Sequence, residues 1–257
     1  MIEIRDASRH SGLAEAVPAP IPREDAPALA SEHRLTVFVN EQPAMRITCT
    51  PSHLAELAAG RLLTEGLIRE AADIRLMAVC EQGLTCRVFL REGLALRPSA
   101  DPAVSVSTCC TDTRTLAEVS GDLPAVTPAP WEAGWLRALS ARLRGGEPLY
   151  RQTRAVHACF LSRGGEVLCS REDIGRHNAL DKAVGYGLIR EIDLGACWLF
   201  TTGRMPADMV SKAVRAGIPL LVSKTYPTVE GLAIARRAGL TLVTLRGDGE
   251  PLVWTER

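Results

Sequence analysis

The most varied set of chemically active side chains in this sequence lies in the segment SREDIGRHNALDKAVGYG, residues 170–187. It places Arg, Glu, Asp, His, Asn and Lys around one glycine, between two apolar runs. The run at residues 166–169 predicts a strand and the spacing of Leu180 and Val184 predicts a helix, so Gly175 marks a turn from strand to helix. Such mixed polar chemistry at a turn indicates more than a solvated helix surface.

The start of that helix is suited to bind an anion. A helix N-terminus presents free N–H groups and the positive end of the helix dipole. The side chains expected to shape an anion pocket here are Arg176, His177, Asn178, Asp181 and Lys182. The residues alone also allow a second interpretation, a helix start whose polar side chains cap its own backbone.

Two further turns are expected beside this one. Gly203 and Arg204 precede a helix that opens with Pro206, where backbone N–H groups and a guanidinium can meet a phosphate. Lys224 and Tyr226 follow the next strand and would line the same rim. A plain strand-to-helix turn with a surface arginine is the alternative, but several such turns in one crevice favour a ligand that carries phosphate.

A different chemistry is indicated by the adjacent Cys109 and Cys110, which lie in a loop rich in Pro, Ser and Thr at residues 97–130. A thiol on a polar loop can ionise, whereas a buried thiol is usually inert. A sulfur relay needs such a thiolate, which attacks a donor persulfide and holds its outer sulfur. Arg114 would favour the thiolate and Asp112 would oppose it. The alternative is a pair of incidental loop cysteines.

A zinc-dependent deaminase is a third chemistry to consider, because His157 begins an H-x-C sequence where those enzymes have H-x-E. Cys159 replaces the glutamate that acts as general acid and base. Residues 205–209, where the companion P-C-x-x-C would lie, contain no cysteine. We therefore expect no metal site, and we expect His157 to be a pocket wall or a strand histidine with satisfied hydrogen bonds.

Composition excludes several classes of partner. Thirty Lys and Arg balance thirty Asp and Glu in 257 residues, so no global charge attracts nucleic acid or an anionic membrane. No apolar stretch approaches the roughly 20 residues that span a bilayer. The first 30 residues are charged and rich in Pro and Ala, which predicts a disordered lead rather than an export signal. We expect a cytoplasmic protein whose eight cysteines are mostly free thiols.

The pattern divides the chain into a small α+β subdomain at residues 31–96, the long flexible loop at 97–130 and an α/β domain at 131–257. The subdomain is predicted to contain a hairpin of residues 34–39 and 44–49, a helix that opens at Pro51, and a hairpin of residues 74–80 and 86–90. The larger domain is predicted to contain a helix at 131–143, strands at 156–161, 166–169, 196–201, 219–223 and 240–245, and helices at 178–189, 207–216 and 229–238. This alternation predicts a three-layer α/β sandwich with a mixed sheet and a ligand crevice beyond the carboxyl ends of its strands.

Several segments together resemble the formate dehydrogenase accessory sulfurtransferases, the FdhD family. Residues 170–187 are similar to the family signature almost word for word. Further similar segments are PSHLAELAAGRLLTEGLI at residues 51–68, TTGRMPADMVSKAVRAGIPLLVS at residues 201–223 and AGLTLVTLRGDGEPLVWT at residues 238–255. The resemblance covers most of the chain from about Leu35 onward. It implies the cytidine deaminase type of three-layer α/β sandwich.

The resemblance also implies roles for particular residues. The family carries persulfide on the first cysteine of a C-x-x-C pattern, and Cys109 matches that position. The second cysteine of the pattern falls on Asp112, so Cys110 is the candidate second thiol. The family's turn for the guanine-dinucleotide form of the molybdenum cofactor aligns with Leu245, Arg246, Gly247, Asp248, Gly249 and Glu250. Glu250 stands where a basic residue is usual.

The implied function is sulfur transfer from a cysteine desulfurase, through a persulfide on Cys109, to the molybdenum of bis(molybdopterin guanine dinucleotide) for formate dehydrogenase. The implied partners are that desulfurase, the catalytic subunit of formate dehydrogenase and a second copy of the chain in a homodimer. Two alternatives stay open: a chaperone that holds the cofactor without moving sulfur, and the zinc-dependent deaminase.

Overall fold

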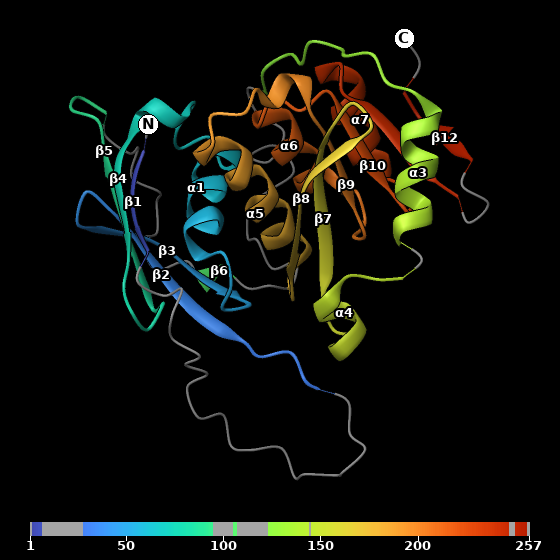
Figure 1. The fold of residues 1–257 in the computed structure, drawn as a ribbon. Coiled ribbons are helices and arrows are strands. Elements are labelled where there is room, and N and C mark those ends of the chain that lie inside the picture. Colours follow the sequence, from blue (N-terminus) through green and yellow to red (C-terminus); the bar gives the residue numbers. More distant parts are fainter. Residues whose placement is uncertain are drawn as a thin grey trace.

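The computed structural model describes residues 2–6, 28–94, 105–106, 123–143, 145–246 and 250–255. Two six-stranded mixed sheets form the frame, sheet A from the first part of the chain and sheet B from the second. Most of the helices lie between the two sheets, and α3 covers the outer face of sheet B (Figure 1). The mixed α/β architecture expected from the sequence is thereby confirmed, and the likeness to the cytidine deaminase sandwich stays a prediction.

Sheet A is built around two hairpins. Its strands run in the order β1-β4-β5-β2-β3-β6. Their bounds are β1 Glu3–Asp6, β2 His33–Val39, β3 Gln42–Cys49, β4 Ile74–Val79, β5 Thr85–Leu90 and β6 Ser105–Val106. Asn40 and Glu41 join β2 to β3 with φ of 46° and 67°, the left-handed geometry that a tight two-residue hairpin requires. Both hairpins predicted for this region are confirmed.

Sheet B has the strand order β12-β11-β10-β9-β7-β8. Its bounds are β7 His157–Arg163, β8 Glu166–Asp173, β9 Trp198–Thr201, β10 Leu220–Ser223, β11 Thr241–Leu245 and β12 Pro251–Val253. The parallel strands β9, β10 and β11 are buried along their whole length, because helices cover both faces of the sheet. Because β7 is antiparallel to β9, the beginning of β7 lies beside the carboxyl end of β9.

The helices are α1 Leu54–Thr64, α3 Ala133–Leu143, α4 Pro148–Thr153, α5 Arg176–Ile189, α6 Ala207–Arg215 and α7 Val229–Ala238, with 3-10 turns at Ala71–Asp73 and Leu194–Ala196. The backbones of α1 and α5 approach each other closely at two glycines. A Cβ atom at Gly60 would overlap the carbonyl oxygen of Asp181, and one at Gly185 would overlap that of Glu56. Only glycine allows this approach, which joins the two parts of the chain.

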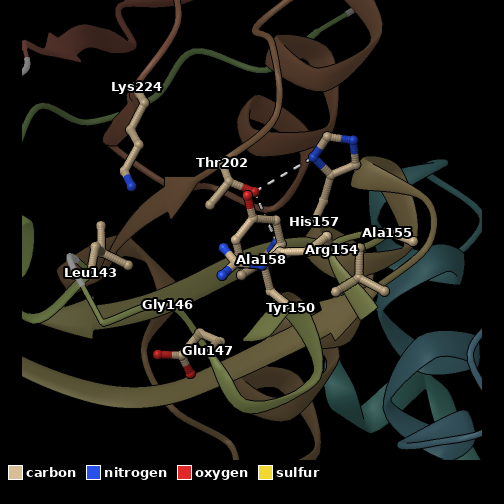
Figure 2. A pocket seen from close by; sticks show the side chains of 11 residues that line it. Leu143, Gly146, Glu147, Tyr150, Arg154, Ala155, His157, Ala158, Thr202 and Lys224 are labelled. Atoms are coloured by element: carbon tan, nitrogen blue, oxygen red, sulfur yellow. Dashed lines mark hydrogen bonds between the residues drawn. The ribbon is translucent and has the colours of Figure 1, made fainter. Parts of the chain in front are cut away.

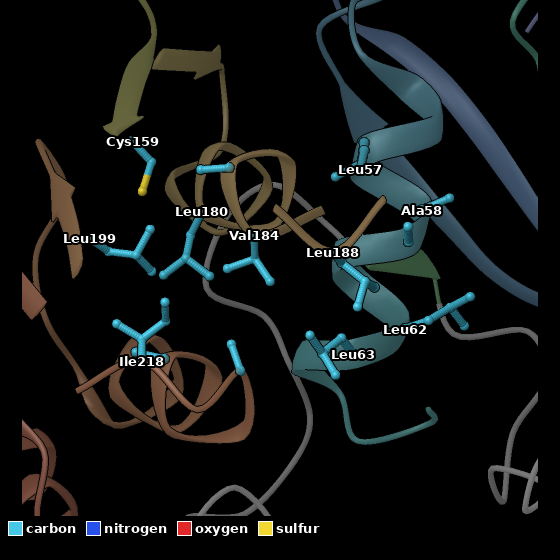
Figure 3. Packing of buried hydrophobic residues seen from close by; sticks show 14 of the residues in the cluster. Leu57, Ala58, Leu62, Leu63, Cys159, Leu180, Val184, Leu188, Leu199 and Ile218 are labelled. Atoms are coloured by element: carbon cyan, nitrogen blue, oxygen red, sulfur yellow. The ribbon is translucent and has the colours of Figure 1, made fainter. Parts of the chain in front are cut away.

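The apolar core is continuous from sheet A, through α1 and α5, to the inner face of sheet B. Figure 3 shows Leu62 of α1, Leu188 and Leu180 of α5 and Leu199 of β9 along this path. A second cluster packs α3 against the outer face of sheet B, where Leu136 is fully buried. The helices on both faces of sheet B explain why its central strands read as uninterrupted apolar runs.

The structure differs from the expected elements at several places. α1 begins at Leu54 rather than at Pro51, because His53 has a left-handed backbone with φ of 56°. β8 extends to Asp173 instead of ending at residue 169. Within the predicted disordered lead, residues 3–6 form β1, which pairs with β4. Among the described helices, none is both long and apolar enough to cross a bilayer.

Candidate functional site

A pocket of about 530 Å³ opens at the carboxyl ends of β9 and β10, the edge of sheet B where the sequence predicted a crevice. Thr202 follows β9, Lys224 follows β10, and His157 begins β7, so three strands contribute to it. Figure 2 shows these side chains around the opening. The complete lining is Leu143, Gly146, Glu147, Tyr150, Arg154, Ala155, Val156, His157, Ala158, Thr202 and Lys224.

Hydrogen bonds hold the strand ends of this pocket in place. The backbone N–H of Ala158 donates to Thr202 Oγ1 at 2.9 Å, and the backbone N–H of Thr202 donates to the Ala158 carbonyl at 2.9 Å. Thr202 Oγ1 also lies 3.5 Å from His157 Nδ1 (Figure 2). The expectation that His157 forms a pocket wall is confirmed.

The opposite wall is α4, a short helix held at its start by a distant carboxylate. Glu172 of β8 accepts the backbone N–H groups of Leu149 and Tyr150 at 2.8 and 2.7 Å. Arg154 ends the helix with a left-handed φ of 55°, and its guanidinium lies 5.3 Å from the ring centre of Tyr150. A non-glycine residue with this backbone costs free energy, and such strain is concentrated at functional sites.

Positive charge surrounds His157. Burial lowers the pKa of His157, and the nearby cations Arg176 and Arg204 lower it further. His157 is therefore neutral at pH 7 and can exchange hydrogen bonds with a ligand. Arg154 and Lys224 supply fixed charge in the lining itself. The pocket thus favours an anionic ligand, as the sequence indicated for this crevice.

Two of the predicted anion-binding residues pack directly against each other. A Cβ atom at Gly203 would lie 2.7 Å from the Cβ atom of Arg176, so glycine is needed for this contact. The Gly203 carbonyl accepts the hydroxyl of Ser223 at 2.7 Å, which ties the turn after β9 to the end of β10. Arg176 is largely buried, whereas Arg204 is exposed. Both guanidinium groups lie close enough to His157, a residue of the pocket wall, to lower its pKa.

His177 does not line the pocket but contacts α6. Its Nε2 atom lies 2.6 Å from Asp208 Oδ2. Burial alone would raise the pKa of Asp208, but the contact with His177 lowers it to about 2. Burial, together with the nearby cations Arg176 and Lys212, lowers the pKa of His177 more than Asp208 raises it. A neutral histidine therefore faces a carboxylate, and this contact fixes α5 against α6 beside the pocket.

Asn178 and Lys182 belong to a buried network around Asp173, between α5 and the start of α1. Lys182 Nζ lies 2.6 Å from Asp173 Oδ2 and donates to Thr50 Oγ1 at 2.6 Å. Asn178 Nδ2 and the backbone N–H of Gly175 both donate to Asp173 Oδ1 at 2.9 Å. The side chains of Lys182 and Asp173 have no exposed surface.

Asp181 anchors the second half of the buried network. It accepts Thr64 Oγ1 at 2.6 Å and lies 2.9 Å from Arg61 Nε and 3.1 Å from Lys212 Nζ. Lys212 also lies 2.8 Å from Glu65. The charges in this network alternate and compensate one another, as burial requires. Asn178, Asp181 and Lys182 thus join α5 to α1 and α6, so their predicted contribution to the pocket is at most indirect.

The predicted cofactor turn is described only at its ends. Leu245 is buried at the end of β11, and the backbone N–H of Arg246 donates to the Glu250 carbonyl at 3.1 Å. The Glu250 carboxylate lies 3.2 Å from Arg137 of α3, so it is committed to a surface ion pair. Gly247, Asp248 and Gly249 lie outside the described residues, as do Cys109 and Cys110.

Sequence reasoning missed several residues of the pocket, namely Glu147, Tyr150 and Arg154. Thr202 belongs to the loop of residues 202–206, which was expected at the crevice. The α4 residues carry no comparable signal, because a six-residue helix shows no apolar period. Within the described part of the chain, no group of three His, Cys, Asp or Glu side chains is arranged to hold a metal ion.

Comparison with known proteins places the chain among close relatives. The model of the FdhD/NarQ family matches residues 30–257. The chain is 32% identical over 240 residues to the sulfur carrier protein FdhD of Mycobacterium tuberculosis, and this alignment covers 86% of this chain and 87% of the relative. It is 31% identical over 224 residues to the sulfur carrier protein FdhD of Bacillus pumilus, and this alignment covers 86% of each chain. The crystal structure of a formate dehydrogenase accessory protein from Desulfotalea psychrophila is similar with a TM-score of 0.72 and 29% identity, over 89% of this chain and 88% of that one.

Proposed function

Because the chain belongs to the FdhD/NarQ family, we propose that it is a sulfur carrier in the maturation of formate dehydrogenase. It accepts persulfide sulfur from a cysteine desulfurase on Cys109. It would then pass this sulfur to the molybdenum of bis(molybdopterin guanine dinucleotide), its substrate, bound in the pocket of sheet B. In that transfer the S–S bond on Cys109 would break, Cys109 would leave as a thiolate, and the metal would supply the two electrons that reduce the sulfur to sulfide. The observation that carries the proposal is the cationic pocket at the carboxyl ends of β9 and β10.

The residues of this pocket suit the phosphates of the cofactor. Arg154 and Lys224 line it with cationic groups, and guanidinium and ammonium groups are the usual partners of phosphate. Neutral His157 adds a group that donates or accepts as the ligand requires. Arg176 and Arg204 strengthen the positive field behind these contacts.

The α4 wall suits the guanine base. Glu147 lines the pocket there, and a carboxylate accepts from two neighbouring N–H groups of the kind that guanine presents on one edge. Tyr150 offers a ring on which a base can stack. This arrangement would place the phosphates near Lys224 and His157 and the base near Glu147. It would explain why a cationic pocket contains the acidic side chain of Glu147.

The position of β6 supports Cys109 as the carrier. Ser105 and Val106 pair in parallel with Arg46 and Ile47 of β3. Cys109 follows Val106 by three residues in the sequence. The end of β3 leads to Thr50, which donates to the Glu172 carbonyl, and the Glu172 side chain holds α4. The strand β6, which precedes Cys109 in the sequence, therefore belongs to a framework that also builds the pocket.

Loading of the carrier is a thiol exchange without net oxidation. The Cys109 thiolate attacks the outer sulfur of the donor's cysteine persulfide. A new S–S bond forms on Cys109, the S–S bond of the donor breaks, and the donor cysteine leaves as a thiolate that takes up a proton. Cys110 is the neighbouring thiol that stands in for the second family cysteine replaced by Asp112.

The proposed function also implies an oligomeric state, a cellular location and a fold type for the protein. The cofactor has two guanosine-phosphate arms, and a homodimer would offer two copies of the pocket to them. The protein would work in the cytoplasm, where the catalytic subunit of formate dehydrogenase receives its cofactor. Its sheet B with helices on both faces would then be the cytidine deaminase type of sandwich.

Mass spectrometry after incubation with a cysteine desulfurase and cysteine tests the carrier. We expect one added sulfur on the Cys109 peptide and its loss in Cys109→Ala, with Cys110→Ala as the matched control that keeps it. An unmodified Cys109 peptide in protein that still binds the cofactor would support the chaperone instead. Stoichiometric zinc in the purified protein would support the deaminase.

Calorimetry with GDP, a fragment of the cofactor, tests the pocket. We expect GDP to bind more tightly than ADP, because Glu147 cannot accept from adenine as it does from guanine. Glu147→Gln should remove this preference while phosphate binding persists. Equal binding of both nucleotides by the unchanged protein would contradict the assignment of the base site.

A further inference from the structure

The outer face of sheet A carries arginines that the proposed function does not use. Along β2, β3 and β5 every second side chain is buried against α1, and the others point outward. The labelled helices all lie on the other side of this sheet (Figure 1). The exposed arginines of its strands β2 to β5 are Arg34, Arg46, Arg75 and Arg87. We call this surface the arginine face.

Two of these arginines flank a second pocket. In the register of β2 and β3, Arg34 stands opposite Thr48 and Arg46 opposite Thr36. These four residues and Ile47 line a pocket of about 430 Å³. Guanidinium groups bind carboxylates through paired hydrogen bonds, and threonine hydroxyls can add further donors. The chemistry of this pocket therefore fits a carboxylate side chain.

The charge of the arginine face is only partly compensated. In the described part of the chain, Arg34 and Arg46 have no ion pair with an acidic side chain. Arg75 lies 5.9 Å from the ring centre of Phe89, and Arg87 lies 2.5 Å from Glu41 and 5.6 Å from the ring centre of Phe38. The protein has a net charge of zero, so this excess is a local feature rather than a general one. An acidic surface is its complement.

The arginine face adjoins the strand that leads to the carrier cysteine. Ser105 of β6 pairs with Arg46 itself, and Cys109 follows within a few residues. A protein docked over Arg34 and Arg46 would thus stand next to β6, the strand that precedes Cys109 in the sequence. A donor that loads Cys109 has to bring its own persulfide to that cysteine, because the exchange needs contact between the two sulfur atoms.

We propose that the arginine face, centred on the Arg34–Arg46 pocket, is the docking surface for an acidic segment of the protein that donates persulfide sulfur to Cys109. This inference rests on the proposed function and adds to it the surface that selects the donor. Opposite charges on the two proteins speed their encounter, so the contribution of this surface weakens as salt rises.

The test compares two sulfur donors on the full-length chain. A purified cysteine desulfurase with cysteine needs docking, whereas inorganic polysulfide can load an exposed thiolate without it. We expect Arg34→Glu/Arg46→Glu to slow loading by the desulfurase by roughly tenfold or more at low salt, the size of effect that charge steering produces. Loading by polysulfide should be unchanged. Arg163→Glu/Arg236→Glu, which makes the same charge change at exposed positions of sheet B and α7, should behave as the unchanged protein.

The outcomes separate this inference from the function on which it rests. Equal desulfurase loading of the variant and the control pair would overturn the arginine face as a donor site, while the carrier role of Cys109 would stand. No persulfide on Cys109 from either donor would instead overturn the proposed function. If the variant loads normally but no longer binds formate dehydrogenase, the face would belong to that partner and this proposal would be overturned. The same holds if the variant loads normally and loses only binding to a single-stranded RNA.

Discussion

The pocket of sheet B and the buried network between α1 and α5 use charge in opposite ways. In the buried network, Lys182 and Asp181 are fully enclosed and paired with opposite charges. At the pocket, Lys224 and Arg204 are exposed and lie among other cations. Polar density in a sequence therefore marks two different things, a compensated structural contact or an uncompensated binding field.

The largest effect that would break this comparison comes from the buried network. Lys182→Met should lower the free energy of unfolding by about 3 to 5 kcal/mol, because it leaves Asp173 buried without its cation. Lys224→Met, the same substitution at an exposed site, should change it by less than about 0.5 kcal/mol. Urea unfolding followed by circular dichroism measures both. Similar losses in the two variants would show that the two lysines do not differ in role.

The same pair of variants should give the reverse order in ligand binding. Lys224→Met should weaken GDP binding by about 10-fold to 100-fold, since it removes a charged hydrogen bond worth roughly 1.5 to 3 kcal/mol. Lys182→Met, studied at a temperature where it stays folded, should bind GDP within a few-fold of the unchanged protein. Calorimetry measures both constants. A greater loss of GDP affinity in Lys182→Met than in Lys224→Met would show that Lys182 contributes to ligand binding after all.

The sequence predicts one side of this comparison better than the other. The helices with a clear apolar period, such as α6 and α7, are found within a few residues of their predicted bounds. The contact of Lys182 with Thr50 could not be found in this way, because Thr50 lies 132 residues away and meets Lys182 only through the packing of α1. Arg154 was missed for a related reason, since α4 is held by Glu172 from another strand.

A smaller effect is expected from the histidines beside the pocket. The pKa values of His157 and His177 are lowered in the folded protein, mainly by burial. Below pH 6.5 the unfolded chain therefore binds protons that the folded chain does not, and the free energy of unfolding decreases as pH falls. The slope is at most about 1.4 kcal/mol per pH unit for each histidine.

Substitution separates the two histidines in this pH profile. His157→Asn should flatten part of the decrease measured by urea unfolding between pH 7 and pH 5. Saturating GDP should also flatten it, because bound phosphate raises the pKa of His157 towards its ordinary value. His177→Asn is the matched variant, since it removes a buried histidine that faces Asp208 rather than the pocket. A GDP effect that persists in His157→Asn but disappears in His177→Asn would place the ligand on the α6 side.

The smallest effect concerns the acidic Glu250, which follows the end of β11. Glu250→Lys should raise GDP affinity by about two-fold to five-fold, the range of an exposed charge pair worth roughly 0.5 to 1 kcal/mol. Arg137→Ala is the control, because it breaks the same surface ion pair without adding a cation to the turn. Equal affinities in both variants would mean that the turn lies outside the phosphate field. The gain expected in Glu250→Lys alone would extend that field from Lys224 at the end of β10 to the end of β11, so the whole carboxyl edge of the parallel strands would form the binding region.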